Sequence, residues 1–170
     1  MLLAAASFGS VAVTALVPSS AERDLAAFAP TADIPDPSTT IPGVAIVAGR
    51  PFVEDVSTTT PIQCDGVAYP QPVPDAVAAH ALAHGAVSIT YDPARTSPRT
   101  IAALTDRVTG SPYLLLSPAP GLPTAVSLEA WERQLALDTP DDPRFEQFIR
   151  ALAENPNLAP EAGGECEAEG

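Results

Sequence analysis

The chain has 170 residues, with 8 arginine and lysine residues against 21 aspartate and glutamate residues, and a formal net charge of −13 at pH 7. This balance excludes the basic surface with which proteins bind phosphate backbones, so neither nucleic acid nor an anionic membrane surface is an expected partner. The 46% of apolar residues are enough to bury a hydrophobic core, and the length allows one ordinary domain with extensions.

The first 21 residues are typical of an exported protein. Residues 2–17 form an apolar run without a charge, and the small residues Ser19 and Ala21 follow it at the spacing that signal peptidases prefer. No basic residue precedes the run. The run is also shorter than a typical membrane-spanning helix, which needs about 20 residues. A signal peptide and a membrane anchor both stay open, with a buried or amphipathic helix as the alternative. We expect an extracytoplasmic protein, either secreted or membrane-anchored.

The next segments are a tether and the start of a folded body. Prolines among small and polar residues predict an extended tether over residues 22–40, so the body is expected to begin at Ile41. Residues 44–47 are predicted to form a short strand, and residues 52–60 a weaker one. Pro74 and Asp75 are suited to the first turn of a helix, and Gly85 stands where a helix end requires a positive φ.

The second half of the body alternates strands with helices. Residues 87–91 and 113–116 are predicted to be strands, and residues 98–108 a helix. Residues 124–137 are interpreted as one strand that passes through Trp131, with a helix as the competing assignment. A last helix is predicted to begin at Asp142 and Pro143. Beyond residue 155 the chain is rich in Pro, Gly, Ala and Glu, which indicates an acidic tail over residues 156–170.

Short motifs spread from Ile41 to Cys166 resemble a known bacterial family. They are Cys64 shortly before Gly66, Val67 and Tyr69; Pro-Val-Pro-Asp leading to His80 and to His84-Gly85; the strand that ends in Tyr91; LLSPAPGLP over residues 115–123; Ala130-Trp131 with Arg133; and the C-terminal cysteine. The family is a domain of unknown function, DUF3105. Its relatives usually carry a glutamate where this chain has Ala83, and further histidines near Phe52 and residues 57–61.

The resemblance implies an exported or membrane-anchored protein with an α+β body. Together with the predicted elements, it leads us to expect a single α+β domain over residues 41–155, in which two or three helices pack on a small mixed sheet.

His80 and His84 lie four positions apart on one predicted helix, so both imidazoles share a face and could bind one Zn²⁺ or Cu²⁺ ion. Two ligands do not complete a site, and Ala81 stands where a metalloprotease of the H-E-x-x-H type needs its glutamate. Candidates for a third ligand are Asp65, Tyr69, Asp75 and Asp92. The alternatives are a structural role, with His84 near the helix C-terminus and His80 hydrogen-bonded in the core, and acid–base catalysis.

Cys64 and Cys166 are the only two cysteines, and in an exported protein an isolated pair most often forms a disulfide. In the chain-entropy account, closing such a loop stabilises the fold by about 4–5 kcal/mol. We therefore expect the acidic tail to be tethered by this bond. The alternative is a reactive or metal-binding thiol at Cys64, although the neighbouring Asp65 opposes thiolate formation.

Three aromatic residues, Trp131, Tyr69 and Tyr91, are candidates for ligand contact or for core packing. The sequence contains no nucleophile elbow, P-loop or dinucleotide-binding fingerprint, so no catalytic residue is assigned. We therefore favour a non-enzymatic accessory or binding protein of the cell envelope, whose partner is a membrane or cell-envelope protein complex. The alternative is a metal-binding protein or metal-dependent enzyme that uses His80 and His84 with zinc or copper.

Overall fold

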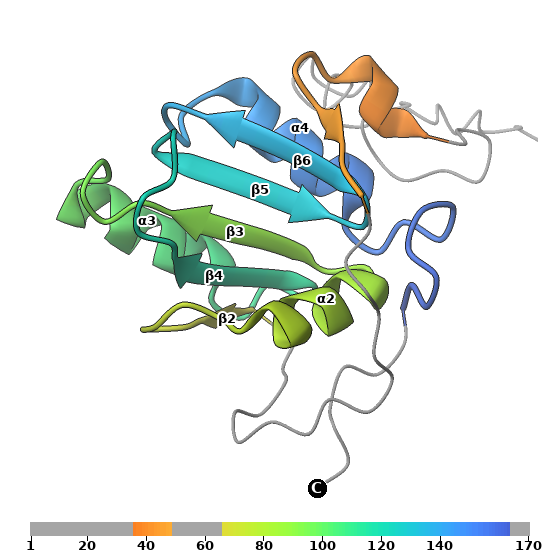
Figure 1. Ribbon diagram of the computed structural model, residues 1–170, viewed down its shortest axis with the longest axis horizontal. Coiled ribbons are helices and arrows are strands. Elements are labelled where there is room, and N and C mark those ends of the chain that lie inside the picture. The colour runs from red at the N-terminus through yellow and green to blue at the C-terminus, as the bar shows by residue number, and fades with distance from the viewer. Residues whose placement is uncertain (1–35, 49–65, 164–170) are drawn as a thin grey trace, which may run out of the picture.

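A mixed sheet of six strands is the centre of the computed structural model, which describes residues 36–48 and 66–163 (Figure 1). The order across the sheet is β1-β6-β5-β3-β4-β2. Strands β2, β3 and β4 are parallel to one another, whereas β5, β6 and β1 continue the sheet with antiparallel pairing. The strands are β1 (Ala45–Ile46), β2 (Val67–Ala68), β3 (Val87–Tyr91), β4 (Leu114–Pro118), β5 (Val126–Ala130) and β6 (Arg133–Leu137).

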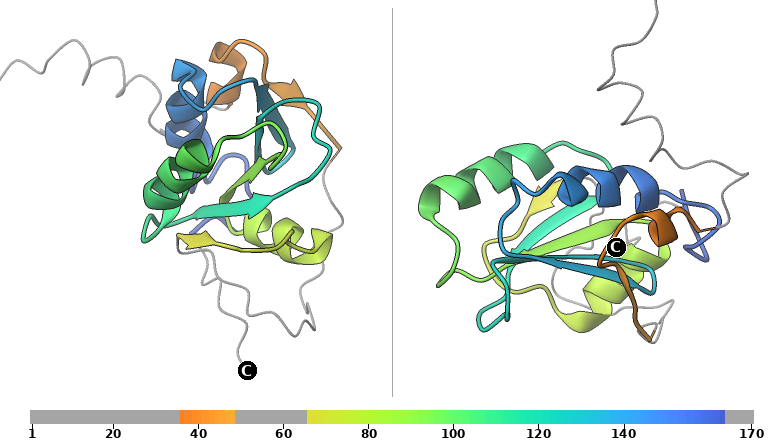
Figure 2. Two further views of the ribbon diagram at one scale, coloured as in Figure 1. Left: turned by 90° about the vertical axis from the view of Figure 1, so that its left-hand side faces the viewer. Right: turned by 90° about the horizontal axis from the view of Figure 1, so that it is seen from above.

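Three α-helices of the described part cover the two faces of the sheet unequally. Helices α3 (Pro98–Val108) and α4 (Pro143–Leu152) lie side by side on one face, and α2 (Asp75–Ala83) lies on the other (Figure 2). The sequence determines where α3 and α4 begin, because the side chains of Ser97 and Asp142 accept hydrogen bonds from backbone N–H groups of the first turn. The expected α+β body with a small mixed sheet and two or three helices is therefore confirmed.

The main hydrophobic core lies between the sheet and the α3/α4 layer. Alternate residues of each central strand point into it, which is the period-2 pattern expected of a strand with one buried face. The largest fully buried members are Phe148, Ile89, Leu114, Leu116, Leu128, Leu135 and Leu137.

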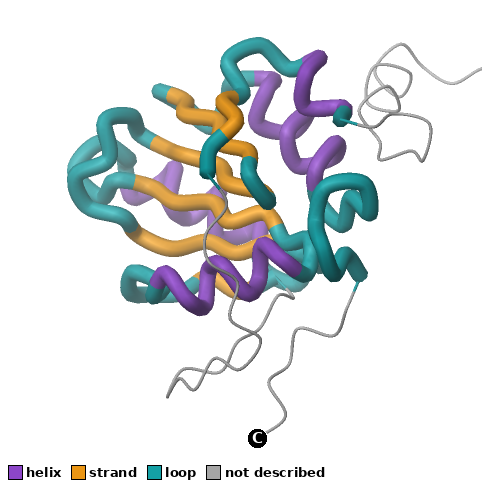
Figure 3. The backbone as a smooth tube through the Cα atoms, turned by 45° about the vertical axis from the view of Figure 1, so that its right-hand side comes forward, coloured by secondary structure: helices purple, strands orange, loops and turns teal. Residues whose placement is uncertain are grey.

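The opposite face of the same strands is polar. It carries Ser88 and Thr90 of β3, Ser117 of β4, Ser127 and Glu129 of β5, and Gln134 of β6. Helix α2 lies over the β3–β4 side of this face, where Ala81 contacts Leu115, and no helix of the described residues lies over the antiparallel strands beside it (Figure 3). The two faces of one sheet therefore serve different purposes, since only one of them forms the main core.

Most predicted elements agree with the structure, and one is wrong. Residues 124–137 form a hairpin of β5 and β6 and not one strand, because Trp131 and Glu132 make a two-residue turn in which Glu132 has a φ of 56°. Trp131 therefore lies at the turn of the hairpin. The predicted strand over 52–60, the N-terminal apolar run and both cysteines lie outside the described residues.

Residues on either side of the expected body, 41–155, also contact it. The last residues of the segment assigned to the tether form the 3₁₀ helix η1 (Pro37–Thr40), in which Ser38 is buried. At the other end, Ala159 is buried and residues 158–163 fold back onto the end of α2. Among the helices of residues 36–48 and 66–163, none has the length and apolar character needed to cross a membrane.

Candidate functional site

The two histidines lie together at the C-terminal end of α2, as their spacing predicts. The centroids of the His80 and His84 rings are 4.5 Å apart, and the rings are tilted by 55°. His84 is the C-cap residue of the helix and is only 8% exposed, whereas His80 is partly exposed. The Nδ1 atom of His84 is buried and has no hydrogen-bond partner within the described part of the chain.

Residues 154–163 complete the end of this helix. The backbone N–H of Glu161 donates to the carbonyl of Ala83, and the N–H of Gly163 donates to the carbonyl of His84, at 3.0 and 3.2 Å. These bonds satisfy carbonyls that a helix end leaves without an intrahelical partner. The same segment brings the Glu161 carboxylate to 3.4 Å from Nε2 of His84.

A complete metal site is not formed by the residues described. No group of three or more His, Cys, Asp and Glu side chains within residues 36–48 and 66–163 is arranged to hold a metal ion. Of the four candidates for a third ligand, Asp65 lies outside these ranges, and Asp92 instead accepts a hydrogen bond from the N–H of Ala94 and pairs with Arg95. Glu161 is the carboxylate that lies next to the pair, and sequence spacing did not indicate it.

The other predicted site residues have different surroundings. Tyr69 packs near Ala81 and Leu115 under α2, and Tyr91 packs against the main core. Both tyrosines therefore contribute to packing. The predicted disulfide between Cys64 and Cys166 lies outside the described residues, so it stays a prediction.

The polar face of the sheet forms a cleft that we name the sheet-face cleft. Its volume is about 270 Å³, and its floor consists of the six polar residues of β3, β4, β5 and β6 named above, with α2 and the β4–β5 loop as walls. Ser88 and Ser117 are only 5% and 3% exposed. Their hydroxyl groups line the cleft and make no hydrogen bond to any described residue. Neither oxygen is among the buried polar atoms that lack a partner in the described part of the chain, so both hydroxyls open into the cleft, where water or a ligand can reach them.

The remaining polar groups of the floor are held in place by one another. The side-chain amide of Gln134 donates to the Glu129 carboxylate at 3.1 Å and to the Ser127 hydroxyl at 3.3 Å. The Thr90 hydroxyl donates to the carbonyl of Ser127 at 3.3 Å. Because these partners lie on regular strands in fixed register, the carboxylate and the hydroxyls form a preorganised surface.

A second hollow on the same face contains Trp131. It has a volume of about 220 Å³ and is lined by the ends of β1 and α2 and by the β5–β6 hairpin. Glu129 and Gln134 line this hollow as well as the sheet-face cleft, so the two adjoin. Trp131 was predicted as a residue for ligand contact or packing, and it lies half-buried beside a polar cavity.

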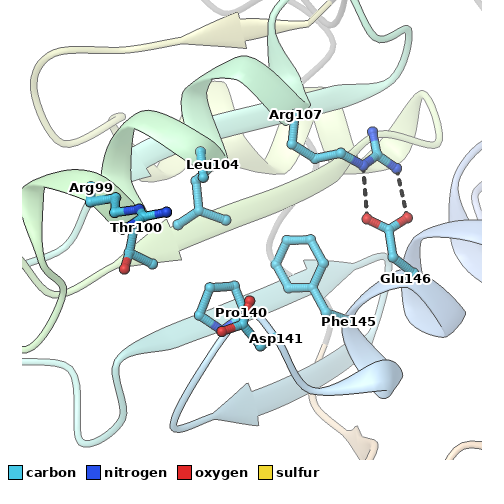
Figure 4. A pocket seen from close by; sticks show the side chains of 9 residues that line it. Arg99, Thr100, Leu104, Arg107, Pro140, Asp141, Phe145 and Glu146 are labelled. Carbon is cyan, nitrogen blue, oxygen red and sulfur yellow. Dashed lines mark hydrogen bonds and ion pairs between the residues drawn. The ribbon is translucent and has the colours of Figure 1, made fainter.

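A larger groove of about 480 Å³ lies between α3 and α4 (Figure 4). Leu104 and Phe145 form its apolar floor, and Arg107 donates two hydrogen bonds, of 2.8 and 2.9 Å, to the Glu146 carboxylate across it. These hydrogen bonds raise the pKa of Arg107. Because the ion pair joins the two helices, we interpret it as a packing feature.

The polar cleft was missed in the sequence although a signal for it exists. The strands Val87–Tyr91 and Val126–Ala130 read VSITY and VSLEA, so serine and other polar residues alternate with buried aliphatic residues. Alternation shows that one face is polar, but it does not show that the polar faces of four strands meet in one cleft beside a short helix. That depends on the strand order.

The described residues thus form an α+β domain with a hydroxyl-lined cleft on one sheet face and a histidine pair at one helix end. Residues 57–168 match the family model of the protein of unknown function DUF3105. The chain belongs to this family, which confirms the resemblance seen in its motifs. No curated protein and no solved structure matches the chain.

Proposed function

We propose that this protein is a non-enzymatic, extracytoplasmic binding protein of the cell envelope and that the sheet-face cleft is its binding site. The observation that carries the proposal is the pair of serine hydroxyls, Ser88 and Ser117, which open into the cleft and make no hydrogen bond to a described residue. Hydroxyl groups that open into a cleft without a protein partner can each donate and accept hydrogen bonds there. A ligand that donates and accepts hydrogen bonds gives them a role.

The location is supported by the apolar run over residues 2–17 and by the isolated pair of cysteines. The test is a fusion of the full chain to alkaline phosphatase at its C-terminus, expressed in a bacterium. This reporter is active only where its disulfides form. We expect activity with the intact chain and none after deletion of residues 2–17, the matched control. Absence of activity from both fusions would contradict the location.

The same material tests the predicted disulfide between Cys64 and Cys166. Protein that is unfolded without reductant and treated with an alkylating reagent is expected to gain no mass, whereas a reduced sample gains two labels. Two labels without reduction would remove the disulfide and, with it, one support for an oxidising compartment.

A second candidate function is metal handling through His80 and His84. It is favoured by the 4.5 Å separation of the two rings and by the buried Nδ1 atom of His84, which lacks a hydrogen-bond partner in the described ranges. Imidazole nitrogens suit zinc and copper. Elemental analysis of the purified full chain, compared with the His80→Ala/His84→Ala variant, tests it. Stoichiometric metal that is lost in the variant supports metal handling, and equal trace amounts in both reject it.

A further inference from the structure

The cleft has the chemistry of a site for a sugar. We propose that the sheet-face cleft and the adjoining Trp131 hollow bind a saccharide of one or two rings, an inference that rests on the proposed binding function. A pyranose ring has hydroxyl groups around its edge and C–H groups on its faces. The two hollows offer a matching division between polar and apolar surfaces, as the contacts of each one show.

The floor of the cleft supplies hydrogen-bonding groups suited to sugar hydroxyls. The Ser88 and Ser117 hydroxyls each donate one hydrogen bond and accept others, so they can serve a ligand hydroxyl in either sense. Ser88 lies directly opposite Glu129 in the pairing of β3 with β5. Residues opposite each other on one face have Cβ atoms about 5 Å apart, which lets a hydroxyl and a carboxylate reach neighbouring hydroxyls of one ring.

The walls supply apolar contacts for the faces of a ring. Three apolar side chains line the cleft: Val73 from the segment before α2, Ala78 from α2, and Leu122 from the β4–β5 loop. In the adjoining hollow, Trp131 offers an aromatic surface next to Glu129, on which C–H groups can stack. A small polar metabolite without an apolar face would leave these surfaces in contact with water only.

The charges select against acidic ligands. Glu129 belongs to both hollows and Asp75 lines the cleft, whereas no arginine of residues 36–48 and 66–163 lines either of them. A neutral sugar or an amino sugar is therefore favoured over a uronic acid, and the ammonium group of an amino sugar is also attracted to the face of Trp131.

The volumes limit the size of the ligand. The hollows measure about 270 and 220 Å³, and each lies just below the range of about 300–1,000 Å³ typical of ligand pockets. Each hollow is thus suited to one ring. Because they share Glu129 and Gln134, two linked rings can occupy both.

Trp131 makes binding directly observable, because it is the only tryptophan in the chain. The full chain is titrated with glucose, glucosamine, glucuronate and cellobiose while tryptophan emission and heat of binding are recorded. We expect saturable binding of glucose and glucosamine in the millimolar range, at least tenfold tighter binding of cellobiose, and glucuronate at least tenfold weaker than glucosamine. Co-sedimentation with cellulose then distinguishes a free sugar from a ring within a polymer.

Alanine variants separate a binding role from a structural one. Ser88→Ala and Ser117→Ala are each expected to weaken sugar binding by about tenfold, the loss typical of one hydrogen bond. Their unfolding midpoints should stay close to that of the wild type, because neither hydroxyl makes a hydrogen bond to a described residue. Thr109→Ala, at an exposed position at the end of α3, is the matched control and should change neither quantity.

The inference is overturned if none of the four sugars gives a saturable signal in either measurement, or if both serine variants bind as tightly as the wild type. When the phosphatase fusion is active, that result rejects the sugar as ligand of the cleft and leaves the proposed extracytoplasmic location standing. Conversely, an inactive fusion together with sugar binding would reject the extracytoplasmic location and support the sheet-face cleft as a binding site.

Discussion

The ion pair between Asp36 and Arg133 tests whether residues 36–40 belong to the folded domain. Arg133 is buried at the start of β6, and its guanidinium donates hydrogen bonds to the Asp36 carboxylate at 2.8 Å, to the Ser38 hydroxyl at 3.1 Å and to the Glu132 carbonyl at 2.9 Å. Ser38 in turn donates to the second oxygen of Asp36 through both its hydroxyl and its N–H. The 3₁₀ helix η1 is thereby fixed to the sheet by a charged network.

Replacement of Asp36 by alanine leaves the Arg133 guanidinium buried without its negative partner. Removal of one partner from a fully buried pair costs about 3–5 kcal/mol. The Asp36 side chain is 22% exposed, so water can replace part of the lost interaction, and we expect a loss of about 2–3 kcal/mol in the free energy of unfolding. Urea denaturation of the full chain at pH 7 measures it.

The dependence on pH follows from the same contacts. Burial opposes ionisation of Asp36, but the hydrogen bonds from Arg133 and Ser38 outweigh it and hold the pKa of the carboxyl below its ordinary value of 3.8. A lowered pKa stabilises the folded state above pH 3.8, and this contribution is lost as the pH falls through the folded-state pKa. The difference in stability between wild type and Asp36→Ala should therefore shrink below pH 3.8.

Two further variants complete the test. Asp138→Ala removes an exposed carboxylate just after β6 and is expected to change stability by less than about 0.5 kcal/mol. Addition of Arg133→Met to Asp36→Ala removes the stranded charge, so the double variant should be more stable than the sum of the single losses predicts. If the free energy of unfolding of Asp36→Ala lies within about 0.5 kcal/mol of the wild-type value, this network does not hold η1 on the sheet.

Three other predictions concern the helix ends and the core. Gly85→Ala should lower the free energy of unfolding by about 2 kcal/mol, because Gly85 has a φ of 92° and an added Cβ would lie 3.0 Å from Cα of Glu154. Urea denaturation measures this loss, and an unchanged unfolding midpoint would contradict the prediction. Phe148→Ala should cost about 3–5 kcal/mol in the same assay, because Phe148 is completely buried between α4 and the sheet, and a loss below 1 kcal/mol would contradict the packing. Hydrogen bonds from Arg144 lower the pKa of Asp142 to about 2, so NMR titration should give a midpoint near that value that moves toward 3.8 in Arg144→Gln.

The sequence predicted the elements whose signals are local. The strand Val87–Tyr91 and the helix Pro98–Val108 have the bounds that periodicity and capping residues indicate, because those signals lie within each element. The β5–β6 hairpin was missed for a local reason as well. Its turn consists of Trp131 and Glu132, and neither residue is one that turns favour, so the positive φ of Glu132 has no signature in the sequence.

The candidate site was only partly predictable, since its parts are brought together by the topology. The spacing of His80 and His84 fixes their proximity on one helix, and the structure confirms it. The proximity of Glu161 depends on the fold-back of residues 158–163, which no periodic pattern predicts. In the same way, Ser88 and Ser117 belong to one cleft only because β3 and β4 are neighbours in the sheet.

Helix α2 connects the features of the polar face. Its first half contributes Asp75 and Ala78 to the sheet-face cleft, and its last turn carries the histidines. With nine residues it is too short to be stable by itself, so its position depends on the contacts at its two ends. At the C-terminal end those contacts come from residues 154–163, which donate hydrogen bonds to the final carbonyls. A substitution in the His84–Glu161 pair therefore acts on the same helix that forms one wall of the cleft.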